Sequence, residues 1–269
     1  MKKTKIIIPA LGILLLSTAA SVTGTVAWFS MNEKVTATKM SIKAKGEAGI
    51  AIAAYTGENQ GTAPVASAFS DTADATAQSL ENMRPTWTND GDKWYHAKST
   101  NSNSAAASAQ YGYEDVSSAK DIYLWNKFAI KATGAPTNVY VTSIEVSGSQ
   151  GTGFDNCIRV LVRAGDKKLV FAPVSHSTAT ETLSANLYVA VEGDDGHPDD
   201  AVTQDQTVTL KAIDTADALV FTSLGSTAQP VEIFMFYDGE DANCTSDLIP
   251  ATWVANALSV NFSNSYTGA

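Results

Sequence analysis

The sequence predicts an all-β protein, a jelly-roll-like antiparallel β-sandwich that follows a short apolar leader. Apolar and polar residues alternate with a period of two along many short segments. Gly, Asp, Pro and Ser residues separate these segments, as expected for strands joined by turns. The body, residues 28–269, is long enough for one large all-β domain or two small ones, and we predict one.

The first 27 residues have the layout of a secretory signal: three lysines, an apolar run and then small residues. Cleavage after Ala27 places Thr25 and Ala27 at the positions where a signal peptidase needs small residues, and Ala20 is a second candidate. The alternative is an uncleaved anchor, because no charge occurs between Lys5 and Glu33. We expect removal, because most of the stretch after the apolar run is Ser, Thr, Gly and Ala.

The body of the chain is acidic. Loss of the leader removes three lysines and no acids, which changes the formal net charge from −10 to −13. Phosphate backbones are bound by clustered Lys and Arg, so nucleic acid is not an expected partner. Acidity also keeps an exported protein soluble.

The first strand is expected where Met40, Ile42 and Ala44 point one way and the intervening polar residues point the other. The next is expected over residues 49–55. Nine further strands are expected at residues 124–134, 138–148, 157–165, 168–174, 185–193, 206–213, 218–225, 231–239 and 257–262.

Two of these strands carry specific predictions. In one, Ile158, Val160 and Val162 alternate with Arg159 and Arg163, which predicts a buried face and a polar face. In the other, residues 231–237 are apolar on both faces, which predicts a place in the middle of a sheet.

Residues 58–121 depart from the pattern and are rich in Ala, Ser, Thr, Asn and Asp, which predicts a long polar insertion. Within it, residues 66–83 have room for a short helix. Trp87, Trp94 and Tyr95 are expected to fold back onto the sandwich; a carbohydrate-binding aromatic platform is the alternative.

The two cysteines, Cys157 and Cys244, are a candidate disulfide in an oxidising compartment, and two buried free thiols are the alternative. Without nearby histidines they make a poor zinc site.

Little in the sequence points to catalysis, and we predict no enzyme and no catalytic residue. The three histidines lie in polar contexts, and neither an H-E-x-x-H helix nor a G-x-S-x-G elbow occurs. No cofactor is expected, with calcium as the one candidate ion, held by Asp238, Glu240 and Asp241 after an expected central strand. These residues are equally typical of turns, and no EF-hand spacing is present.

The stretch GTVAWFS at residues 24–30, followed by VTATKMSIKAK at residues 35–45, resembles the start of the TasA and camelysin group. These are exported Gram-positive proteins with a SipW-dependent type of signal. The segments YLWNKFAIKA and VEIFMFYDGEDANC are similar to parts of exported clostridial proteins. The resemblance implies cleavage between Ala27 and Trp28 and a jelly-roll-like fold. The cysteine pair and the polar insertion depart from TasA.

The resemblance also implies a function. TasA-like proteins form extracellular filaments of the biofilm matrix by donating the N-terminal strand of one subunit to the next. Carried over here, the donor strand would contain Trp28, Phe29, Val35, Met40 and Ile42. Its partners would be further copies of the chain, the signal peptidase during export, and the membrane only transiently through the leader. The expected location is the extracellular matrix or the cell surface.

Two other functions remain open. The N-terminal strand could instead pair within its own subunit, leaving a monomeric surface module that binds glycan or a host surface. Camelysin itself has been described as a metal-dependent protease, but the sequence offers no matching set of metal ligands or nucleophile.

Overall fold

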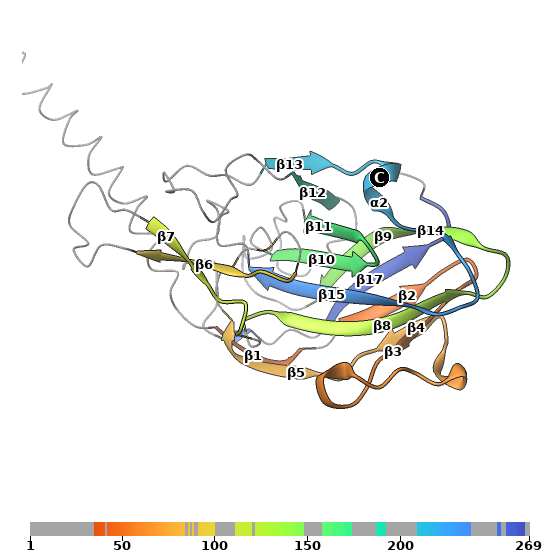
Figure 1. The fold of residues 1–269 in the computed structure, drawn as a ribbon, viewed down its shortest axis with the longest axis horizontal. Coiled ribbons are helices and arrows are strands. Elements are labelled where there is room, and N and C mark those ends of the chain that lie inside the picture. Colours follow the sequence, from red (N-terminus) through yellow and green to blue (C-terminus); the bar gives the residue numbers. More distant parts are fainter. Residues whose placement is uncertain are drawn as a thin grey trace, which may run out of the picture.

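The computed structural model describes residues 35–40, 42–83, 86, 88, 91–99, 111–119, 122–147, 158–173, 187–191, 209–237, 252–253 and 257–266. These residues form a β-sandwich, which confirms the predicted all-β fold (Figure 1). The short α2 (Thr215–Ala218) is the only α-helix among them, and the Asp214 side chain caps its first turn.

The larger layer of the sandwich is a seven-stranded antiparallel sheet. Its strands lie in the order β13 (Thr209–Ala212), β12 (Leu187–Val191), β11 (Lys167–Pro173), β10 (Ile158–Ala164), β15 (Gln229–Tyr237), β8 (Leu124–Ala132) and β3 (Ile50–Ala54). The predicted central position of residues 231–237 is confirmed, because β15 lies between β10 and β8.

The smaller layer is a five-stranded sheet that lies behind β10, β15 and β8 in Figure 1. Its order is β14 (Leu219–Leu224), β9 (Thr137–Ser147), β17 (Ala257–Ser263), β2 (Ile42–Gly46) and β4 (Thr72–Asp74). Its pairs are antiparallel except that of β17 with β2, which is parallel.

Two small sheets complete the described part of the chain. One has the order β16 (Thr252–Trp253), β1 (Val35–Met40) and β5 (Gln78–Met83), and the other is a hairpin of β6 (Tyr95–Ser99) and β7 (Tyr111–Asp115). The hairpin belongs to the polar insertion and was not foreseen from the sequence.

The main core lies between the two large sheets, where apolar side chains of both inner faces meet. Alternation works as predicted along β10, where Ile158, Val160 and Val162 are buried in this core. Leu258 and Phe262 of β17 are buried in it as well.

A second, smaller core covers the outer face of the seven-stranded sheet. Leu161, Phe234 and Phe236 project from β10 and β15 on this side, and Trp94 and Ile122 of the insertion region pack against them. This cover explains why β15 is apolar on both faces.

The same cover makes one expectation wrong. Arg159 was expected on a polar face of its strand, but its side chain is fully buried. It lies opposite Phe236 on the covered outer face, and its Nη1 donates to the carbonyl oxygen of Ile158 at 3.0 Å. The alternation was correct, and Trp94 was expected to fold back onto the sandwich, but the sequence did not reveal that the insertion covers this face.

The region that had room for a helix forms strands instead. A 3-10 turn, η3 (Ala66–Ala68), is followed by β4 and β5. Burial alternates along this stretch: Thr72 and Asp74 are exposed, whereas Ala73 and Ala75 are buried. Pairing of β4 with β2 therefore overrides the helix propensity of the alanines.

Candidate functional site

The N-terminal segment, residues 35–46, lies between strands that come from distant parts of the chain. Its first part, β1, pairs with β5 on one side and with β16 on the other. Its second part, β2, pairs with β4 on one side and with β17 on the other. We call the space between these four flanking strands, β4, β5, β16 and β17, the strand slot.

The segment runs parallel to both C-terminal neighbours. Thr36 and Ala37 are in register with β16, and Ile42 to Gly46 are in register with Leu258 to Phe262 of β17. Two parallel strands cannot be joined by a tight hairpin and need a long connection. Here almost the whole chain separates β1 and β2 from β16 and β17.

Side-chain size falls along the buried face of β2. Ile42 and Ala44 are almost fully buried, and Gly46 follows on the same face. A Cβ at Gly46 would lie 2.6 Å from the carbonyl oxygen of Ile50, a contact that no side chain tolerates. Because Ile50 begins β3, this contact lies in the turn after β2, and the slot itself buries a large side chain at Ile42 and a small one at Ala44.

The exposed face of β2 adds little binding energy. Lys43 pairs with Asp74 at 3.5 Å and Lys45 with Glu47 at 2.8 Å, and the four side chains are 46–68% exposed. Exposed pairs of this kind contribute about 0–1 kcal/mol each. The buried face and the backbone hydrogen bonds hold the segment, including that from the Ala75 N–H to the Ile42 carbonyl oxygen at 3.0 Å.

A short turn links β2 to β3 and so joins the two large sheets. Ala48 and Gly49 both have left-handed backbone conformations, with φ of 51° and 84°. The turn is anchored by Thr133, whose N–H donates to the Gly49 carbonyl oxygen at 2.8 Å, and by Asn264, whose Nδ2 donates to the Ala48 carbonyl oxygen at 2.9 Å.

At the end of β3 that lies away from this turn, the edge of the seven-stranded sheet is closed by a side chain. The antiparallel pairing of β8 with β3 ends where the Tyr55 N–H donates to the Lys127 carbonyl oxygen. Beyond it, Gln60 Oε1 accepts from the Lys127 N–H at 2.5 Å and its Nε2 donates to the Trp125 carbonyl oxygen at 2.8 Å. The Gln60 amide thus replaces one peptide group of a paired strand. Gln78 Nε2 donates to the same Trp125 oxygen at 2.6 Å.

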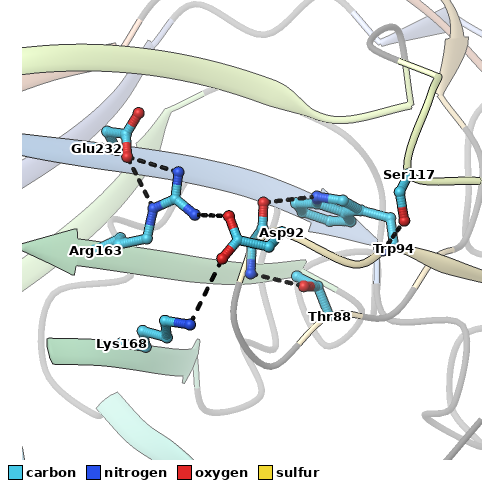
Figure 2. A network of polar contacts seen from close by, with 8 residues as sticks. Thr88, Asp92, Trp94, Ser117, Arg163, Lys168 and Glu232 are labelled. Carbon is cyan, nitrogen blue, oxygen red and sulfur yellow. Dashed lines mark hydrogen bonds and ion pairs between the residues drawn. The ribbon is translucent and has the colours of Figure 1, made fainter. Parts of the chain in front are cut away.

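An ionic network fastens the insertion to the outer face of the sheet (Figure 2). Arg163 bonds Glu232 on the neighbouring strand through Nε at 2.8 Å and Nη2 at 2.7 Å, and it also pairs with Asp92. Lys168 lies 3.7 Å from Asp92. Burial acts to lower the pKa of Arg163, but the bonds to Glu232 and Asp92 outweigh it, so its pKa is raised.

Trp94 is the centre of the second core. Its side chain is 1% exposed and stacks on Tyr123 at a centroid distance of 4.1 Å. The prediction that Trp94 folds back onto the sandwich is confirmed, and its ring is not available as a ligand platform. Tyr95 is half-buried, and Trp87 lies outside the described residues.

The predicted site residues fall into two groups. Val35 begins β1, Met40 ends it, and Ile42 begins β2, so these three lie in the strand slot of their own chain. Outside the described residues lie Ala27, Trp28, Phe29, Cys157, Cys244, Asp238, Glu240 and Asp241.

Within the described ranges, no cluster of three or more His, Cys, Asp or Glu residues has an arrangement suited to a metal ion. The helices of those same ranges include none with the length and apolar composition to span a bilayer.

Sequence reasoning missed Gln60, Gln78, Asp92 and Glu232. Glutamines at a strand edge carry no local signal, and the pairing of Arg163 with Glu232 depends on strand register.

No protein-family model, curated protein or solved structure matches the chain.

Proposed function

We propose that this chain is an exported structural subunit that self-associates into an extracellular filament or surface layer by exchanging its N-terminal segment between copies. The observation that carries the proposal is the strand slot. The segment of residues 35–46 is held between four strands that come from later parts of the chain. The same contacts can be made by the segment of a second copy, as in domain swapping.

The physical chemistry of such an exchange is strand addition. Backbone hydrogen bonds supply affinity, and alternate side chains set the register. Ile42 alone, fully buried, contributes about 1.5–3 kcal/mol of transfer free energy to whichever copy receives it. The resemblance of residues 24–45 to TasA-like proteins supports the same mode of assembly.

Removal of the leader is the proposed switch. Cleavage between Ala27 and Trp28 releases the start of the N-terminal segment from the membrane, so exchange begins only outside the cell. In the structure the segment pairs within its own chain, as the monomeric alternative also expects. That alternative gains no further support from Trp94, because its ring is buried in the second core.

The first test is negative-stain electron microscopy of the chain beginning at Trp28, beside a chain that retains the leader. We expect filaments from the shorter chain only. A peptide of residues 35–46 in excess should occupy the slots and suppress assembly, whereas the same peptide with I42D should not. Dispersed monomers at high concentration from both chains would refute the proposal.

A further inference from the structure

The turn between β2 and β3, which follows the segment held in the slot, has a strained backbone. Ala48 has φ of 51°, a left-handed conformation that side chains other than Gly, Asn and Asp rarely adopt. Gly49 follows with φ of 84°, so two successive residues must be left-handed for β2 to lie in its own chain's slot. The Ile50 N–H donates to the Glu47 carbonyl oxygen at 3.3 Å, which makes the turn tight.

We propose that residues 47–49 are the hinge of strand exchange and that the strain at Ala48 sets the balance between the closed chain and the exchanged assembly. The inference rests on the proposed function, and the partner is a second copy of this chain. In the closed chain the turn sends the backbone from one large sheet to the other. In the exchanged form this chain's β2 lies in a neighbour's slot, and residues 46–50 run extended between the two copies.

The strain belongs to the closed form alone. An extended backbone has negative φ, which Ala adopts without strain. Replacing Ala48 by Gly therefore relieves no strain in the exchanged form. The slot contacts are the same in both forms, so they cancel from the balance. Short strained hinges favour domain swapping for this reason.

Two single substitutions at the hinge move the balance in opposite directions. A48G removes the left-handed strain and should favour the closed chain by about five- to tenfold. G49A adds the same strain and should favour the exchanged form by a similar factor. A Cβ at Gly49 meets only the Thr133 hydroxyl oxygen, at 3.6 Å, so the change introduces strain without a clash.

A third substitution is the matched control. Gly165, in the turn between β10 and β11, is also left-handed, with φ of 58°, and a Cβ there has no neighbour within 4 Å. G165A therefore introduces the same left-handed alanine away from the slot. It should lower stability as G49A does and leave the balance between monomer and assembly unchanged.

The experiment uses the full chain, exported with its own leader by a Gram-positive host and recovered from the medium. Size-exclusion chromatography with light scattering, over a range of protein concentrations, gives the ratio of monomer to assembly for the four chains. The expected order of assembly is G49A, then wild type and G165A together, then A48G.

Two outcomes would overturn the hinge. One is assembly that the peptide of residues 35–46 suppresses but that A48G and G49A leave unchanged; strand exchange would then stand without this hinge. The other is an equal shift by G165A and G49A, which would assign the effect to general destabilisation. Absence of assembly in all four chains, with no effect of the peptide, would remove the proposed function together with the hinge.

Discussion

At the residue scale, the falling side-chain size along β2 is the most specific feature of the strand slot. Ile42 and Ala44 are buried in the main core, and Gly46 leaves room for the Ile50 carbonyl oxygen in the turn that follows. One-residue slips would turn the lysines into the core.

Substitution of Ile42 tests how much the slot contributes to the fold. We expect I42A to lower the free energy of unfolding by about 2–5 kcal/mol, because it leaves a cavity in a fully buried site. Urea denaturation measures this. V65A is the control, since Val65 is 69% exposed and its change should stay within about 0.5 kcal/mol. A small effect of I42A would mean that the segment is only loosely held.

The docking of Trp94 should depend on pH through Asp115. Ser117 donates to Asp115 through its hydroxyl at 2.5 Å and its N–H at 2.9 Å, and both bonds lower the pKa of Asp115. Ser117 Oγ in turn accepts from the backbone N–H of Trp94 at 2.9 Å. Because the pKa of Asp115 is lower in the folded chain, the ionised carboxylate stabilises the fold at pH values above the ordinary pKa near 4. This stabilisation is lost as the pH falls through the lowered pKa of the folded chain.

We therefore expect the fluorescence of the Trp94 region to change on acidification below about pH 4. D115N keeps an acceptor but does not titrate, so its signal should not change over the same range. An equal acid response in both chains would assign the effect to other carboxylates.

At the scale of elements, the sequence predicted the strands better than it predicted their neighbours. The alternation of Ile158 to Val162, and the two apolar faces of residues 231–237, located β10 and β15 correctly. The predicted strand through Met40 and Ile42 is divided, because the chain passes from one sheet to another after residue 40. Alternation reports which face a residue occupies and carries no information about which strand lies beside it.

Gln60 provides a test at the same scale. Q60A removes the acceptor for the Lys127 N–H, and we expect hydrogen exchange of that amide to accelerate by about tenfold, the equivalent of one typical hydrogen bond. Q78A is the control, because Gln78 contacts Trp125 and leaves the Lys127 N–H bonded to Gln60. Equal acceleration in both variants would show that the edge opens as a unit.

At the scale of the whole molecule, the seven-stranded sheet connects two cores. Phe234 lies in the outer core, and its neighbours Ile233 and Met235 lie in the main one. The sequence predicted that Trp94 folds back onto the sandwich, but it did not predict which face Trp94 covers, because the insertion is mostly polar and only a few of its residues pack inward. Shared strands should make the two cores unfold together.

We expect near-ultraviolet circular dichroism, which reports the aromatic cluster around Trp94, to follow the same urea transition as far-ultraviolet circular dichroism. D92A removes the carboxylate that pairs with Arg163 and Lys168. It should therefore move the near-ultraviolet transition to lower urea than the far-ultraviolet transition. Separate transitions in the wild-type chain would show that the insertion folds as its own unit.

The parallel pairing of β2 with β17 also constrains when the chain can fold. Ile42 is in register with Leu258, 216 residues later. At 5–20 residues per second, a ribosome needs about 10–40 seconds between the two. During that interval the first strands have no partner for one of their edges, and contacts of such long range form slowly. Strands β1 and β2 therefore gain their second neighbours only after β16 and β17 have been made, so the strand slot is completed last although the segment that fills it is made early.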